Sequence, residues 1–386
     1  MNRSRILQPI FFIIVLFSVL DFYRNVRTNR NENRSVVNYS VIQTSKRSKI
    51  GNVKGDIGLN DSSLTKNGIF WSDLAETFVP KGLTLNDSLK LVERLRSKVV
   101  TSLTPGTVTL CGNSKGGKVI LEDGTIMCAK YKRKWRSVYA EALAYYLSRL
   151  LRLDNVPEVI LASTDPYSER WKRVNISALS WQGNETVALV AWQRDCRHKT
   201  MMPQTIRNAF LKEEPVTNRT IHTSISLKRN STLTAELIQW GTIIIFDNLI
   251  GHYDRLIQIH RTDQFSGTRS LHNSIMSSKG KIWLIDHERA FFYYQERYNM
   301  PPTYFYKTII PFYDKILKTM CVFQSSLVER LQMLSEQPSP FKSLWDLASL
   351  HEPLMDTIPK DLRSEVYAKL FNLRLKEIMS WIRQCK

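Results

Sequence analysis

The sequence contains few cysteines and few acidic residues. Its 386 residues include five cysteines and no Cys-x-x-Cys pair, which excludes the usual cysteine signature of a zinc site or a thioredoxin-like centre. It has 35 acidic and 55 basic residues, and the resulting net charge of +20 favours acidic partners. A helix-turn-helix pattern, an aromatic RNA-binding signature and zinc-ligand spacing are all missing, so nucleic acid is not the expected partner.

The chain also lacks internal repeats and a second break in composition after residue 67. Residues 24–67 are rich in Asn, Arg, Ser, Lys and Thr, with few large apolar side chains. They cannot bury enough surface to offset the entropy of ordering, so they are predicted to form a disordered stem. An apolar content of 43% suits a packed body, and residues 68–386 are predicted to form one folded domain.

An apolar run near the N-terminus predicts a membrane anchor. Residues 6–23 form the expected transmembrane signal anchor, and residues 1–5 form a cytosolic tail. At about 1.5 Å per helical residue the run is short for a bilayer core of about 30 Å, which suits a thin early-secretory membrane. No small-x-small site follows it, so an uncleaved anchor is favoured over a cleaved signal peptide. Arg24, Arg27 and Arg30 oppose the type II orientation under the positive-inside rule.

Asn-x-Ser/Thr sequons answer that objection, because all of them follow the anchor and indicate a lumenal body. The predicted glycosylation sites are Asn33, Asn38, Asn60, Asn86, Asn175, Asn184, Asn218 and Asn230.

Apolar periodicity predicts strands in the first part of the body, followed by helices. The pair Asp123–Gly124 marks a hairpin turn within the strand-rich part. The predicted elements are strands at 107–110, 119–121 and 126–131, a helix at 138–153, a helix from about 234, a strand at 281–285 and several helices between 325 and 386.

A glycine-rich string at 112–118 fits the start of a phosphate-binding P-loop, but we reject that interpretation. Val119 occupies the position of the magnesium-binding Ser or Thr, and the string leads into a strand where a P-loop requires a helix. A glycine-rich hairpin over nucleotide phosphates, the protein-kinase arrangement, fits the strand context better, with Gly116 and Gly117 as ATP-binding residues. An ordinary flexible hairpin is the alternative.

The side chains that kinase chemistry requires occur in the required chain order. Lys130, within the third apolar strand, is the candidate for the ATP phosphates, although a solvated basic cluster is the alternative. Glu141, near the start of the next helix, is the candidate ion-pair partner of Lys130. Asp254 lies in a His-Tyr-Asp-Arg sequence and is the candidate catalytic aspartate. Asp286 ends a strand and, with Glu288, could hold a hard divalent cation.

The segment at 246–256, Phe-Asp-Asn-Leu-Ile-Gly-His-Tyr-Asp-Arg-Leu, resembles the Phe-Asp-Tyr-Leu-Thr-x-Asn-Phe-Asp-Arg-Leu motif of the four-jointed box family of Golgi-lumen kinases. Further segments are similar in the same order, so the resemblance covers about residues 68–385. They are Gly68–Ser72 with Val79–Gly82, Asp123–Thr125 with Cys128, Glu141–Leu147, and Cys321–Phe323.

This resemblance implies an α+β fold of the atypical secretory-pathway kinase type. Its small β-rich N-lobe would span about 68–160 and its mainly helical C-lobe about 161–386. It further implies a single-pass type II protein of the Golgi membrane that uses ATP and Mn²⁺ or Mg²⁺. The implied substrates are Ser or Thr residues in extracellular cadherin domains of the Fat and Dachsous type, and the implied role is in adhesion and planar polarity. Secretion after cleavage in the stem is an alternative fate.

Two positions depart from the family pattern. His287 replaces the asparagine of the family's Asp-Asn-Glu metal motif, and Ile259 occupies the place of the metal-binding asparagine expected five residues after Asp254. Gln258 could substitute, as could Asn273, which matches a family asparagine before the metal strand. These departures leave a pseudokinase that acts as a lumenal binding protein as the alternative. A Golgi glycosyltransferase is a further alternative, although the sequence lacks the Asp-x-Asp motif that many of those enzymes use.

In an oxidising lumen the five cysteines would form at most two disulfides. We hypothesise a Cys111–Cys128 bond that staples the glycine-rich hairpin and a Cys321–Cys385 bond that ties the C-terminal helix to the body, with Cys196 free. The sequence itself does not fix this connectivity.

Overall fold

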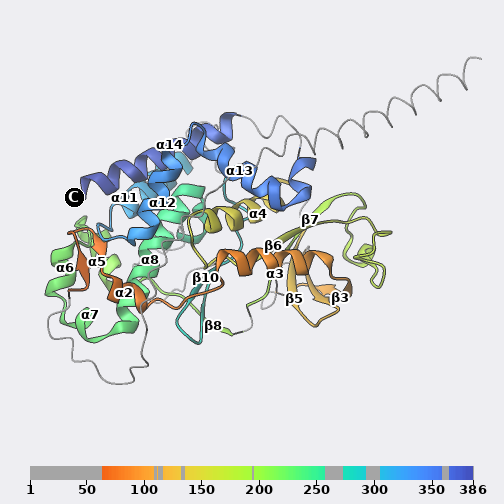
Figure 1. Ribbon diagram of the computed structural model, residues 1–386, viewed down its shortest axis with the longest axis horizontal. Coiled ribbons are helices and arrows are strands. Elements are labelled where there is room, and N and C mark those ends of the chain that lie inside the picture. Colours follow the sequence, from red (N-terminus) through yellow and green to blue (C-terminus); the bar gives the residue numbers. More distant parts are fainter. Residues whose placement is uncertain are drawn as a thin grey trace, which may run out of the picture. The chain divides into compact units, whose positions relative to one another are not determined.

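The computed structural model describes residues 63–107, 111, 116–131, 135–193, 195–256, 273–292, 305–358 and 365–385. The predicted cytosolic tail, the predicted anchor and most of the predicted stem lie outside these residues. Figure 1 shows the β-sheet of the described domain at one side and a group of helices at the other.

An antiparallel five-stranded sheet forms the first part of the domain, in the order β3-β4-β5-β7-β6. The strands are β3 (Val100–Pro105), β4 (Gly117–Leu121), β5 (Ile126–Lys130), β6 (Val159–Ser163) and β7 (Thr186–Ala191). The predicted turn joins β4 to β5, and Gly124 adopts the positive φ of 79° that favours glycine there. The predicted strand at 107–110 lies mostly outside the described residues, and β3, which pairs with β4, comes earlier in the chain.

Helix α4 (Trp135–Leu150) contacts strands β6 and β7, and α3 (Leu85–Ser97) lies against β6. Apolar side chains occupy most faces of α4, and such a helix is expected to be covered on all sides. Most of its residues from Val138 onwards are buried, in agreement with that expectation. The helix begins three residues before the predicted start at 138 and ends at Leu150, where the chain turns through Arg152 at a φ of 58°.

A long buried helix, α8 (Ser231–Ile250), forms the centre of the helical part. Asn230 caps its start by accepting a hydrogen bond from the backbone of Leu233 at 2.9 Å, and Gly251 ends it at a φ of 64°. Within the described residues α8 is the helix long and apolar enough to cross a membrane, but 89% of its apolar window is buried inside the domain. We therefore assign α8 to the core.

Helices α2 (Asp73–Thr77), α7 (Ile225–Arg229), α11 (Ile310–Leu317) and α14 (Glu365–Gln384) pack against α8, and other helical elements lie elsewhere in the domain. The longer of these are α12 (Ser325–Ser335) and α13 (Pro340–His351). Shorter ones are α5 (Gln204–Lys212), α6 (Asn218–Thr223), η2 (Ile176–Leu179), η3 (Phe305–Ile309) and η4 (Pro353–Thr357). A three-stranded sheet of β8 (Cys196–Lys199), β9 (Ser274–Ser277) and β10 (Ile282–Leu284) lies in the order β10-β9-β8.

The N-lobe begins and ends at other residues than predicted. The sheet of the N-lobe continues to Ala191, well past the predicted boundary near 160, because β7 returns between β5 and β6. The first described segment, with β1 (Thr65–Lys66), β2 (Phe70–Trp71) and α2 (Asp73–Thr77), belongs to the helical lobe. The Trp71 amide donates to the carbonyl of Phe323 at 3.0 Å, which joins two of the segments that carried the family resemblance.

Both hypothesised disulfides are present, and Cys196 is free. Cys111 bonds to Cys128 on β5, and Cys321 bonds to Cys385 just beyond α14. The second bond fixes the end of the last helix to the chain before α12, so the C-terminus is held against the helical lobe.

Candidate active site

Lys130 at the end of β5 and Asp286 after β10 meet directly. The Nζ atom of Lys130 lies 3.1 Å from Oδ1 of Asp286, and 19% and 26% of the two side chains are exposed, so the pair is open to a ligand. Burial lowers the pKa of Lys130, but the carboxylates of Asp286 and Glu141 outweigh burial and raise it. Lys130 is therefore a permanent cation beside a carboxylate, an arrangement suited to phosphate and metal ligands.

Glu141 on α4 is buried, and its partner differs from the predicted one. Between these two described residues there is no ion pair of the predicted Lys130–Glu141 kind. Instead, Oε2 of Glu141 lies 3.3 Å from Nδ1 of His287. Burial raises the pKa of Glu141 to about 7, against the lowering effect of Lys130. Glu141 thus holds the segment after β10 and acts on Lys130 through its charge.

His287, which stands where the family has asparagine, therefore contacts Glu141. Burial lowers its pKa well below the usual value, with Arg255 adding to the effect, so the ring is neutral. A neutral imidazole can donate from Nδ1 to the Glu141 carboxylate, as an asparagine amide could.

Asp254 lies just beyond α8, and a partner that the sequence did not indicate contacts it. Nη1 of Arg289 lies 3.3 Å from Oδ1 of Asp254, and Nε of Arg289 lies 4.0 Å from Oε1 of Glu288. The Asp254 side chain is 21% exposed and the Arg289 side chain is 40% exposed. Part of the Asp254 side chain thus stays exposed beside the arginine.

Arg255 fixes the Asp254 segment to the Asp286 segment. Its guanidinium pairs with Asp247 on α8, and both side chains are fully buried. It also donates to the carbonyl of Asn273 at 3.0 Å and to that of Ile285 at 3.1 Å. The sequence contained one indication of this ion pair, since the motif carries a second acid, Asp247, eight residues before Arg255. The sequence could not reveal that Arg255 faces inward.

His252 makes a second link between the two segments. Its Nε2 atom lies 2.9 Å from the carbonyl oxygen of Asp286, and its own carbonyl accepts from the Tyr313 hydroxyl at 2.5 Å. Asp286 has a φ of 60°, in the left-handed region that non-glycine residues rarely adopt. Such conformations cluster at functional sites, where the surrounding contacts maintain them.

The predicted metal ligands Asp286, Glu288 and Asn273 come from adjacent segments. Asn273 precedes β9, and its carbonyl accepts from the backbone of Ile285 at 3.0 Å, which places it beside the strand that leads to Asp286. In the described part of the chain no group of three or more His, Cys, Asp or Glu side chains forms a complete metal cage. Two carboxylates nevertheless fit Mn²⁺ or Mg²⁺ as used with nucleotides, because such ions take only one or two protein carboxylates beside phosphate oxygens and water. Ile259 and Gln258 lie outside the described residues.

The predicted ATP-binding glycines lie at the start of β4, and both are buried. A Cβ atom at Gly117 would approach a methyl group of Leu179 to 2.8 Å, so packing gives a reason for a small residue there. Gly116 accepts a hydrogen bond from the amide of Gly106 at 3.0 Å. Their role towards phosphate stays a prediction, and residues 112–115 lie outside the description.

Five of the predicted glycosylation sites lie within the described residues. Four are exposed, namely Asn86, Asn175, Asn184 and Asn230. Asn218 is half-buried, and its side-chain oxygen accepts a hydrogen bond from Thr65. Modification of these sites stays a prediction.

Comparison with known sequences decides the family. The profile of the four-jointed box protein middle domain matches residues 86–386. The chain belongs to the four-jointed box family. It is 26% identical over 327 residues to Four-jointed box protein 1 of Xiphophorus maculatus, covering 83% of this chain and 71% of that protein. It is 25% identical over 338 residues to the Homo sapiens protein of the same name, covering 84% and 72%.

A third relative carries an activity in its name. The chain is 22% identical over 323 residues to the Drosophila melanogaster protein "Extracellular serine/threonine protein kinase four-jointed", covering 71% of this chain and 53% of that protein. This four-jointed box chain therefore spans about half the length of the fly relative.

Solved structures establish the fold. A crystal structure of the Golgi casein kinase with Mn/ADP bound matches with a TM-score of 0.51 at 15% identity, covering 84% of each chain. A structure of hydra Fam20 with sugar matches with a TM-score of 0.50 at 14% identity, covering 79% of this chain and 96% of that one. The predicted α+β, kinase-like fold is confirmed.

Proposed function

We propose that this four-jointed box chain is a secretory-pathway Ser/Thr protein kinase that transfers the γ-phosphate of ATP to extracellular cadherin-type domains. The observation that carries the proposal is the Lys130–Asp286 ion pair, together with the hydrogen bonds by which His252 and Arg255 tie the segment of Asp254 to the segment of Asp286. The name of the fly relative and the fold of the Golgi casein kinase support it.

In this proposal each residue has a separate task. Lys130 binds the α- and β-phosphates, and Glu141 holds the segment that carries Asp286 in place. Asp254 orients the substrate hydroxyl and accepts its proton. Asp286 and Glu288 would hold Mn²⁺ or Mg²⁺, which would neutralise negative charge on the transferred phosphoryl group.

The proposed location is the Golgi membrane, with residues 6–23 as a type II anchor and the catalytic domain in the lumen. The two disulfides and the exposed sequons support an oxidising, lumenal environment. The basic net charge favours acidic substrate surfaces.

A pseudokinase is the second candidate, and the contact of Arg289 with Asp254 favours it. An arginine that remained on the catalytic aspartate would hinder proton acceptance without preventing partner binding. A binding protein of this kind would keep its affinity for cadherin repeats after Asp254→Ala.

The test is phosphate transfer by the full-length chain. The chain is incubated with γ-labelled ATP, Mn²⁺ and a pair of cadherin repeats, beside Asp286→Ala and the control Asp346→Asn, which alters an exposed acid on α13. We expect labelling by the wild type and the control, and almost complete loss in Asp286→Ala. Equal labelling by wild type and Asp286→Ala would refute the catalytic proposal, and no labelling by any of them would favour the pseudokinase.

A further inference from the structure

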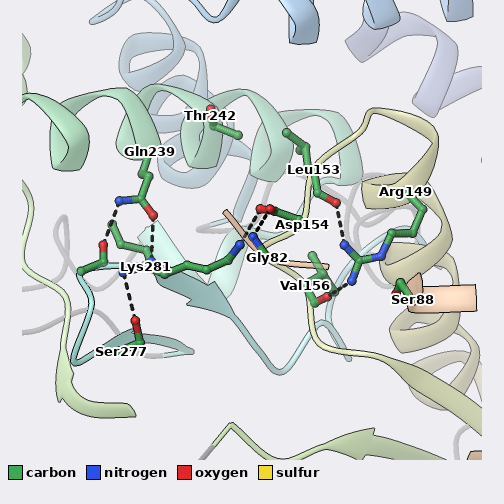
Figure 2. Close-up of polar contacts among 12 residues, drawn as sticks. Gly82, Ser88, Arg149, Leu153, Asp154, Val156, Gln239, Thr242, Ser277 and Lys281 are labelled. Atoms are coloured by element: carbon green, nitrogen blue, oxygen red, sulfur yellow. Dashed lines mark hydrogen bonds and ion pairs between the residues drawn. The ribbon is translucent and has the colours of Figure 1, made fainter. Parts of the chain in front are cut away.

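Gly82 ends the Val79–Gly82 segment, which the proposed catalytic residues leave without a role. Its amide donates to the Asp154 carboxylate in the loop between α4 and β6. A Cβ atom at Gly82 would approach Nζ of Lys281 to 2.5 Å and the Asp154 carbonyl oxygen to 2.8 Å. Three segments far apart in the chain therefore meet with no room for a side chain at Gly82 (Figure 2).

Lys281 supplies the charge at this junction. Its ammonium lies 2.6 Å from Oδ1 of Asp154, and the two side chains are 6% and 33% exposed. The ammonium also lies 5.0 Å from the centre of the Trp283 ring, within the range of a cation–π contact. Burial lowers the pKa of Lys281 below its ordinary value, and the Asp154 carboxylate opposes that effect.

The junction is continuous with the candidate active site through β10. Lys281 directly precedes β10, and Asp286 follows its end by two residues. The amide of Leu284 donates to the carbonyl of Asn155 at 2.8 Å, so β10 contacts the Asp154–Asn155 loop at two points. A one-residue shift of β10 would break both contacts, and they therefore fix its register against the loop.

Gln239 on α8 holds the turn that leads into β10. Its side-chain oxygen accepts from the Ile282 amide at 2.8 Å, and its amide group donates to the Gly280 carbonyl at 2.9 Å (Figure 2). The start of β10 is thus tied to the central helix of the helical lobe as well as to the loop.

The loop that holds β10 is itself rigid. Arg149 at the end of α4 donates to the carbonyl of Leu153 at 2.8 Å and to that of Val156 at 2.7 Å (Figure 2). Glu141 on α4 contacts His287 beyond the end of β10, and Asp154 in the loop after α4 contacts Lys281 just before its start. The position of β10 relative to α4 is fixed at both ends.

We infer that Asp154 and Lys281, packed against Gly82, are positioning residues that set the place of Asp286 relative to Lys130 and so set the affinity for metal-bound nucleotide. The inference rests on the proposed kinase function. Neither side chain touches the nucleotide, and both act through β10.

The test measures the Kd of ADP with Mn²⁺ for the full-length chain by calorimetry. The variants are Lys281→Met, Asp154→Asn and the two combined, with Lys279→Met as the control because Lys279 is an exposed lysine in the same turn. Each protein is first checked for folding by tryptophan fluorescence at the temperature of the titration. If Lys281→Met fails to fold, Asp154→Asn, which keeps the shape of the side chain, decides the outcome.

We expect each single variant to bind about tenfold more weakly, because a small misplacement of a binding group is costly. The double variant should be no weaker than either single one, since one contact is lost in all three. A merely structural role would lower the folded fraction and leave the Kd of the folded molecules unchanged.

Wild-type affinity in both single variants would overturn this inference alone. An absence of binding in the wild type would overturn it together with the kinase proposal. As a second check, Gly82→Ala should weaken binding, whereas Gly183→Ala should not, because a Cβ there meets only a Pro166 carbon at 3.9 Å.

Discussion

Replacement of Arg255 by methionine tests the link between the Asp254 and Asp286 segments. The substitution keeps a long side chain but removes the charge and the donors that hold Asp247, Asn273 and Ile285. Asp247 is fully buried, so it would lose its counter-ion without gaining water.

The expected loss of unfolding free energy follows from these contacts. Removal of one partner from a buried ion pair costs about 3–5 kcal/mol. Loss of the hydrogen bond to the Ile285 carbonyl adds up to about 1 kcal/mol. Loss of the bond to the Asn273 carbonyl adds little, because that carbonyl still accepts a hydrogen bond from the Ile285 amide. We expect a loss of about 4 kcal/mol at pH 8.

The loss should be smaller at pH 6, and the sign follows from the pKa of Asp247. Burial raises this pKa to about 7, against the lowering effect of Arg255, so the folded state binds more protons than the unfolded state above about pH 4. Without Arg255 the pKa rises further, and the carboxyl stays protonated at pH 8. The variant should therefore lose about 1.4 kcal/mol less at pH 6 than at pH 8.

Urea unfolding at both pH values, followed by tryptophan fluorescence with the disulfides intact, measures these differences. Asp247→Asn combined with Arg255→Met should lose the extra pH dependence, because no carboxyl remains at that position. Lys342→Met, which removes an exposed ion pair with Asp346, should change stability by less than about 0.5 kcal/mol. A loss below about 1 kcal/mol in Arg255→Met, or an equal loss at both pH values, would refute this reasoning.

Three further predictions concern stability and are measured by the same urea unfolding. Replacement of Cys321 and Cys385 by serine should cost about 4 kcal/mol, because their sequence separation is 64 residues; a loss under about 1 kcal/mol would contradict this. His287→Leu should cost about 1–3 kcal/mol through the lost Glu141 contact, and His287→Asn should cost less because an amide can donate; the reverse order would contradict it. Burial lowers the pKa of His252, so the free energy of unfolding that the neutral ring contributes above pH 6.5 is lost as the pH falls. His252→Gln should therefore make the free energy of unfolding fall less steeply with decreasing pH, by up to about 1.4 kcal/mol per pH unit. An unchanged steepness would argue against a neutral buried ring.

Local patterns were sufficient for the elements with a strong periodicity or turn signal. The Asp123–Gly124 hairpin, the apolar helix α4 and the long helix α8 all form where expected, apart from shifts of about one turn at their ends. Strands β6 and β7 were not predicted, because short apolar runs do not distinguish a strand from a buried helix segment.

Tertiary contacts decided the remaining features. The segment around Trp71 precedes the N-lobe in sequence but pairs with Phe323, and no local pattern encodes that choice. Chain order indicated Lys130, Glu141 and Asp286 as one group, yet it could not decide which acid pairs with the lysine. That choice depends on side-chain directions and on the neutral His287 ring, which occupies Glu141.

The central claim is that Lys130, Asp254 and Asp286 form one nucleotide site. Calorimetric titration of the full-length chain with ADP and Mn²⁺ tests it most directly, with Asp286→Asn and Asp254→Asn measured in parallel. Our account predicts binding by the wild type, near-complete loss in Asp286→Asn, and affinity close to wild type in Asp254→Asn, whose task is proton acceptance. Equal affinity in the wild type and Asp286→Asn, or no binding by the wild type, would contradict the account.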